Sequence, residues 1–128
     1  MGNNMNLGLI GRISHADKYF KSPEHNKIVT EATDLCTAGK YKECEAVLDK
    51  LPTTEQLFDA LIEKLHGKSV YKTLKAIREG KAGDAITNMT GLSSLMTHVL
   101  IEMKQGRREY GMLIPIIYEQ LGKMVYSV

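Results

Sequence analysis

The sequence predicts an all-α protein of about six to eight helices, stacked as antiparallel hairpins or packed as an irregular helical bundle. Apolar residues recur at helical spacing along most of the chain, and no stretch alternates apolar and polar residues as a half-buried strand would. Residues that begin or end helices are frequent, so the expected connections are short. Short connections favour antiparallel neighbours.

The first well-defined helix is predicted over residues 23–38. Ser22 provides an N-cap oxygen, Pro23 suits the first helical position, and Gly39 can adopt the left-handed conformation that ends a helix. A second helix is expected over residues 41–50, because a proline follows soon after and cannot continue it.

The length of 128 residues predicts a single domain over residues 1–128. Residues 1–20 have the apolar spacing of an amphipathic helix, but Gly8 and Gly11 weaken it. A frayed or docking N-terminal arm is therefore the alternative for this segment.

Thr53 and Gln56 have the spacing of a capping box that opens a third helix, and this helix should end at Gly67. Ser69 is the expected N-cap of the next helix, and Gly80 its expected end. Both helices carry apolar residues on one face, so each should contribute to the core.

A short segment over residues 82–89 precedes the most regular apolar pattern of the chain. Ser93 or Ser94 is predicted to begin that helix and Gly106 to end it. Its apolar residues keep the i, i+3, i+4, i+7 spacing of a core-facing helix.

The last helix is expected over residues 107–125 and contains Pro115. The ring of a proline inside a helix clashes with the carbonyl four residues back, which here belongs to Gly111. We therefore predict a kink within residues 111–115.

Composition excludes several classes of protein. Lys+Arg 17 against Asp+Glu 15 give a formal net charge of +2, and no apolar run approaches the roughly 20 residues that span a bilayer. The N-terminus lacks the pattern of a secretory signal. The two cysteines match no zinc or redox spacing, so we expect a protein of the reducing cytoplasm without a disulfide framework.

Residues 28–52 carry a turn of Gly39, Lys40 and Tyr41 between two helices, with small residues at Ala32 and Cys44 that permit a close crossing. This segment resembles one tetratricopeptide repeat. The resemblance implies a groove that holds a helix or an extended peptide of a partner. A helical hairpin with glycine at its turn, in an unrelated helical fold, is the alternative.

The sequence offers no catalytic residues, no metal ligands and no cofactor motif. The four histidines stand far apart, and no phosphate-binding loop or nucleophile elbow is present. His98 lies one turn before Glu102, which predicts a hydrogen-bonded pair at the edge of the core. We therefore expect a protein that is not an enzyme.

A basic stripe provides one candidate binding surface. Lys68, Lys72, Lys75 and Arg78 recur at helical spacing and could follow a phosphate backbone. Nucleic-acid binding through this stripe is the alternative function, and a solvated helix face would have the same pattern.

The C-terminal segment provides the leading candidate, because it is rich in methionine and tyrosine, which are adaptable at protein interfaces. We predict a non-enzymatic adaptor, chaperone or inhibitor that binds a partner helix or peptide in an apolar groove, through a surface built by the C-terminal helix and the residue 28–52 hairpin. A homodimer is a further possibility. Core filling is the competing interpretation. The predicted contact residues are Tyr110, Met112, Leu113, Ile116, Ile117, Leu121 and Met124.

Overall fold

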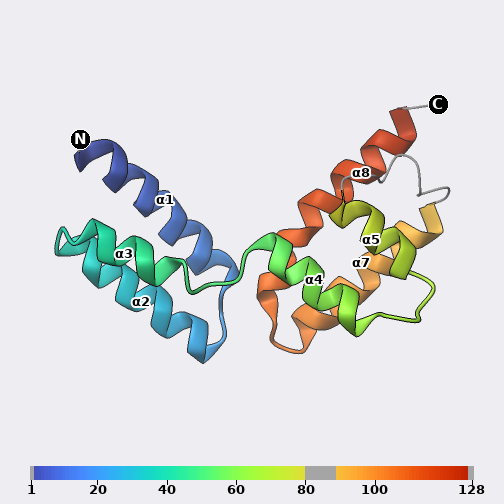
Figure 1. Cartoon of the computed structure of the whole chain (residues 1–128), viewed down its shortest axis with the longest axis horizontal. Coiled ribbons are helices and arrows are strands. Elements are labelled where there is room, and N and C mark those ends of the chain that lie inside the picture. The colour runs from blue at the N-terminus through green and yellow to red at the C-terminus, as the bar shows by residue number, and fades with distance from the viewer. Residues whose placement is uncertain (1, 80–88, 127–128) are drawn as a thin grey trace. The chain divides into compact units, whose positions relative to one another are not determined.

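The computed structural model describes residues 2–79 and 89–126, with side chains described for 7–79 and 91–120. This part of the chain contains seven α-helices and one 3-10 helix, and none of its residues lies in a strand (Figure 1). The all-α prediction is therefore confirmed. The packing divides the chain into two compact units: Met1–Pro52 with Gly106–Glu109 form unit 1, and Thr53–Gln105 with Tyr110–Val128 form unit 2.

Unit 1 contains three helices that all pack on one another: α1 (Gly2–Tyr19), α2 (Pro23–Thr37) and α3 (Tyr41–Leu48) (Figure 1). The N-terminal segment is thus a helix, and its buried residues attach it to the other two. The core of this unit is made of apolar side chains from the three helices and the turns that follow them: Leu9, Ala16, Phe20, Val29, Ala32, Cys44, Val47, Leu48 and Leu51.

The α2–α3 hairpin has the capping that the sequence predicts. The His25 N–H donates to Ser22 Oγ at 3.2 Å, and Pro23 occupies the first turn. Gly39 has φ +78°, a conformation that side chains rarely adopt, and it reverses the chain into α3. Ala32 and Cys44 are both fully buried, so small side chains lie where the two helices pack.

Unit 2 contains α4 (Thr54–Lys64), α5 (Tyr71–Arg78), α7 (Met89–Lys104) and α8 (Ile114–Tyr126). Helix α5 packs on both α4 and α7, and α7 packs on α8. The 3-10 helix η1 (Arg108–Leu113) leads directly into α8. The fully buried side chains described in this unit include Leu61, Leu74, Leu95, Val99 and Leu113, each with 1% exposure or less.

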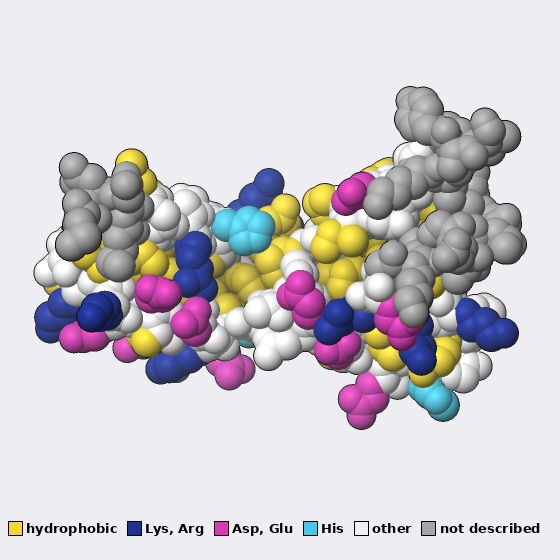
Figure 2. Space-filling model, turned by 45° about the horizontal axis from the view of Figure 1, so that its top comes forward, with side chains coloured by type: hydrophobic (Ala, Val, Ile, Leu, Met, Phe, Trp, Pro, Cys, Tyr) yellow, Lys and Arg dark blue, Asp and Glu magenta, His cyan; other side chains and the backbone are white. Residues whose placement is uncertain are grey.

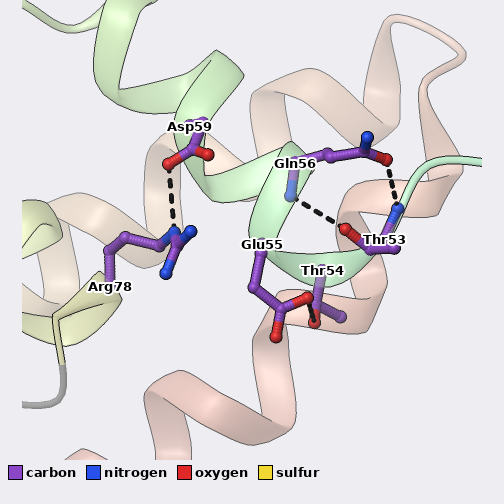
Figure 3. Close-up of polar contacts among 6 residues, drawn as sticks. All are labelled: Thr53, Thr54, Glu55, Gln56, Asp59 and Arg78. Atoms are coloured by element: carbon purple, nitrogen blue, oxygen red, sulfur yellow. Dashed lines mark hydrogen bonds and ion pairs between the residues drawn. The ribbon is translucent and has the colours of Figure 1, made fainter.

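The capping box predicted for α4 is present (Figure 3). The Gln56 N–H donates to Thr53 Oγ1 at 3.1 Å, and the Thr53 N–H donates to Gln56 Oε1 at 2.9 Å. Both donors would otherwise lack an intrahelical acceptor, so the pair fixes the start of the helix. Gly67 follows the end of α4 with φ +84°, as expected for a residue that ends a helix.

Two predicted helix starts are wrong. Val70, not Ser69, is the N-cap of α5, and it has helical dihedral angles and no side-chain cap. Helix α7 begins at Met89, several residues before Ser93 and Ser94. Serine is favoured at an N-cap but is also tolerated inside a helix, so its presence alone does not mark a start.

The predicted kink at Pro115 is replaced by a change of helix type. Instead of one bent helix over residues 107–125, η1 ends at Leu113 and α8 begins at Ile114, which places Pro115 in the first turn of α8. A proline in the first turn lacks an N–H that would have had no intrahelical acceptor, so the clash with the preceding turn is avoided. The predicted end at Gly80 and the segment 82–89, apart from Met89, lie outside the described residues.

Candidate functional site

The C-terminal apolar residues predicted to contact a partner lie mostly in the protein interior. Ile116 is half-buried, and the side chains of Leu121 and Met124 lie outside the described residues. A partner could reach the buried members only if the packing changed. The buried members are Tyr110, Met112, Leu113 and Ile117, each with 8% exposure or less.

The predicted basic stripe is only partly a helix face. Lys68 precedes α5, while Lys72 and Lys75 are exposed on it. Arg78 Nε donates to Asp59 Oδ1 at 3.0 Å (Figure 3), and Lys75 Nζ lies 5.6 Å from the centre of the Tyr71 ring. The ion pair lowers the positive charge that this surface presents.

A groove in unit 1 is lined by α1, α2 and the start of α3. It is a shallow groove, largely open to solvent, with a volume of about 430 Å³ that could receive a few side chains of a bound helix. We call it the α1–α2–α3 groove. Its lining residues are Ile10, Ile13 and Ser14 from α1, Thr33, Cys36 and Thr37 from α2, and Tyr41 from α3.

No lining residue of the α1–α2–α3 groove carries a formal charge at neutral pH. Thr33 Oγ1 donates to the Val29 carbonyl at 2.8 Å, and Thr37 Oγ1 donates to the Thr33 carbonyl at 2.9 Å. Both hydroxyl protons are therefore already used within α2. An apolar occupant of the groove would leave these hydrogen bonds intact, so it would not leave those two donors unpaired.

Helix α1 extends the apolar surface beyond the groove. Ile10 is 46% exposed, and Leu7, one turn earlier on the same helix, is 67% exposed. Sequence reasoning predicted a groove on the residue 28–52 hairpin but missed the α1 wall, because Gly8 and Gly11 weakened the helix prediction for that segment. The spacing of Leu7, Ile10 and Ile13 was the available signal.

A second groove of about 520 Å³ runs along α2 and differs in chemistry. Four of its lining residues are charged, with both signs present: Lys27, Glu31, Asp34 and Lys40. Basic and acidic side chains are interspersed in the same way over the face shown in Figure 2. An apolar segment is therefore better matched to the α1–α2–α3 groove.

Two buried carboxylates were not foreseen as core residues. Glu109 is 6% exposed, and its Oε2 lies 3.6 Å from His25 Nδ1. Glu102 is 4% exposed and accepts a hydrogen bond from Lys64 Nζ at 2.6 Å. Charge patterns in a sequence favour solvated faces, so only the tertiary arrangement reveals acids that are buried with a cation or a histidine beside them.

The two cysteines, whose spacing matched no motif, belong to helices that pack on each other. Cys36 lies in α2 and Cys44 in α3, and neither is in a disulfide. Burial raises the pKa of the Cys44 thiol above its ordinary value, and the neighbouring Cys36 raises it further. Cys36 is half-buried and lines the α1–α2–α3 groove, so the two thiols differ in access.

Among the residues that the structure describes, no group of three or more His, Cys, Asp or Glu is placed to hold a metal ion. None of the described helices combines the length and the apolarity that crossing a bilayer requires.

Comparison with known proteins found no matching family model, no similar curated protein and no similar solved structure. The resemblance of residues 28–52 to a tetratricopeptide repeat thus stays a prediction.

Proposed function

We propose that this protein is a non-enzymatic binding module that receives an apolar segment of another protein in the α1–α2–α3 groove. The observation that carries the proposal is a groove wall without a charged residue, continued on α1 by exposed apolar side chains. The proposal keeps the predicted class of function and the residue 28–52 hairpin as part of the contact surface, and it replaces the predicted C-terminal helix with α1.

The chemistry of the groove indicates what the occupant should carry. Ile10, Ile13 and Cys36 offer apolar contact, and Tyr41 offers a ring with a polar tip. An amphipathic helix would present apolar side chains at i, i+3, i+4 and i+7 to such a surface. A charged or phosphorylated segment would lose hydration without gaining an opposite charge from the lining residues.

The binding preference can be tested with a display library of peptides that carry Leu, Ile, Met or Phe at helical spacing. The same residues in scrambled order provide the reference library. We expect the full chain to enrich the patterned peptides, and Ile10→Glu to weaken their Kd by at least about tenfold, because the new carboxylate would be desolvated by the bound segment.

Leu100→Glu is the matched control, since Leu100 is 51% exposed on α7, close to the 46% of Ile10. Both substitutions add a charge at an exposed site, so circular dichroism should show that both variants fold. Equal loss of binding in the two variants, or no preference for patterned peptides, would contradict the proposal. Concentration-dependent dimerisation lost only in Ile10→Glu would assign the groove to a second copy of this chain instead.

Nucleic-acid binding is the second candidate, and it is favoured by the exposure of Lys68, Lys72 and Lys75. If the protein binds nucleic acid, its affinity should fall steeply as the salt concentration rises. The affinity of an apolar segment for an uncharged groove should be nearly independent of salt. The reducing cytoplasm is the compartment that we propose for either function.

A further inference from the structure

The ring of Tyr71, at the start of α5, contacts a second ring and a cation. The centres of the His66 and Tyr71 rings lie 4.9 Å apart, with an angle of 75° between their planes. Lys75 Nζ lies 5.6 Å from the centre of the same tyrosine ring. Tyr71 is half-buried, whereas His66 and Lys75 are exposed. One anchored ring thus holds an exposed ring and an exposed ammonium group close to each other.

The turn that carries His66 is fixed by its backbone. The Lys68 N–H donates to the Leu65 carbonyl at 2.9 Å, and the Tyr71 N–H donates to the Lys68 carbonyl at 3.1 Å. Leu65 and Val70 are 4% and 2% exposed, so apolar contacts anchor the turn at two points. The backbone of its exposed residues is therefore in place before a ligand binds, which lowers the entropy cost of binding.

The chain around this turn is basic. Residues 64–78 contain no acidic residue. At the two ends of this stretch, Lys64 and Arg78 pair with carboxylates. Among the residues that the structure describes, no carboxylate forms an ion pair with the three lysines between those ends, so they present their full charge to solvent. All three are exposed: Lys68, Lys72 and Lys75.

We propose that this part of unit 2, the Tyr71 surface, binds single-stranded nucleic acid. The inference deepens the second candidate function, nucleic-acid binding, and it does not depend on the α1–α2–α3 groove. Lysines alone would follow the phosphates of a duplex as well as those of a single strand. An exposed ring beside them adds a platform for an unpaired base, which a duplex does not offer. The residues of the Tyr71 surface are His66, Lys68, Tyr71, Lys72 and Lys75.

The residues of the Tyr71 surface have different roles. His66 is the stacking residue, because its ring is exposed and the contact with Tyr71 orients it. Tyr71 is a positioning residue, since it is half-buried and acts through His66 and Lys75. The lysines bind phosphates, whose negative charge matches theirs. Stacking on a ring depends little on the base, so the expected ligand is a single strand without strong sequence preference.

The test measures binding of the full chain to a fluorescein-labelled single-stranded DNA of mixed sequence, about 12 nucleotides long, and to the same sequence as a duplex. Fluorescence anisotropy gives Kd at several salt concentrations. We expect the single strand to bind at least about fivefold more tightly than the duplex, because only its bases can stack on His66.

Variants separate stacking from charge. His66→Ala should weaken binding of the single strand by at least about fivefold and change binding of the duplex little, whereas His66→Phe should keep the affinity for the single strand. Lys72→Gln with Lys75→Gln should weaken binding of both probes. Because two phosphate contacts are lost, the slope of log Kd against log salt for the single strand should fall by about 1.4.

His15→Ala is the matched control. The exposed His15 ring lies 4.9 Å from the Tyr19 ring on α1, and Lys18 Nζ lies 5.3 Å from the centre of that tyrosine ring. The acidic Asp17 directly precedes this lysine, so the surroundings are of mixed charge. His15→Ala should therefore bind both probes as the unmodified chain does. Circular dichroism should show that both histidine→alanine variants fold.

Three results would overturn the proposal. Equal effects of His66→Ala and His15→Ala, or equal affinity for single strand and duplex, would remove the stacking role but leave phosphate binding by the lysines, so the second candidate function would stand. Absence of binding to either probe would remove both. Binding to vesicles that contain phosphatidylserine, but to neither DNA, would assign the Tyr71 surface to a membrane instead.

Discussion

At Glu102, a carboxylate whose side chain is 5% exposed accepts a hydrogen bond from Lys64 Nζ at 2.6 Å. A second cation–carboxylate pair, Arg12 Nη2 with Asp49 Oδ1 at 3.1 Å, has side chains that are 45% and 64% exposed. A charge that is removed from water depends on its partners much more than one that stays hydrated. Both pairs join a basic side chain to a carboxylate, so comparing them tests how burial changes the contribution of an ion pair to stability.

We expect Lys64→Met to lower the free energy of unfolding by about 1–2 kcal/mol, because a buried carboxylate loses a charged donor. Lys64 itself is half-exposed, which keeps the loss below that of a fully buried pair. Arg12→Met is the control and should cost at most about 0.5 kcal/mol. Urea unfolding followed by circular dichroism measures both. Equal losses would show that burial of Glu102 does not set the strength of its pair.

At the scale of elements, two helical glycines differ in the space that an added side chain would have. A Cβ added at Gly11 in α1 meets nothing within 4 Å, whereas a Cβ at Gly91 in α7 would lie 2.8 Å from Thr73 Oγ1 on α5. Gly91 therefore permits the close approach of α5 and α7. Gly11 only gives α1 a flexible backbone, which lowers its intrinsic helicity.

Gly11→Ala should stabilise the protein by about 0.5–1 kcal/mol, through helix propensity alone. Gly91→Ala should destabilise it by about 1 kcal/mol, since Thr73 is β-branched and can rotate little without disturbing α5. The double variant Gly91→Ala with Thr73→Ala should recover most of this loss. Thermal and urea unfolding of the unmodified protein, the two single variants and the double variant measure these changes in stability. A Gly91→Ala protein as stable as Gly11→Ala would contradict the prediction.

Two of the helix starts that the sequence predicted well have two chemical constraints at one place. Ser22 with Pro23, and Thr53 with Gln56, each combine an N-cap oxygen with a second preference, and both helix starts are confirmed. Ser69 carried only one preference, and packing placed the start of α5 elsewhere. A single favourable cap contributes too little free energy to outweigh the burial of apolar side chains.

The candidate site was less predictable than the fold. Helical spacing shows that residues such as Leu113 and Ile117 share a face, but whether that face meets solvent or the core depends on tertiary packing. The same limit applies to the α1–α2–α3 groove, whose lining residues come from three different helices. The proposed binding site depends on contacts between elements, which periodicity within one element does not encode.

At the scale of the whole molecule, the packing forms two compact units where the length alone predicted one domain. The two compact units describe how the chain packs, whereas a domain is expected to unfold as one cooperative unit. Two compact units can therefore still belong to one domain. Each unit has its own fully buried residues, such as Cys44 in unit 1 and Leu74 in unit 2. This separation of cores favours two cooperative units within the chain.

Matched leucine truncations test that conclusion. Leu74 in α5 is 0% exposed and Leu48 in α3 is 2% exposed, so Leu→Ala at either site should remove about 2 kcal/mol or more of stability through a cavity. In Leu74→Ala, the slowest amides of α4 and α5 should exchange with solvent about 30-fold faster, while those of α2 and α3 change by much less. Leu48→Ala should give the reciprocal pattern, measured by native-state hydrogen exchange. Equal acceleration in both units, for both variants, would instead mean that the chain unfolds as the single domain that its length predicted.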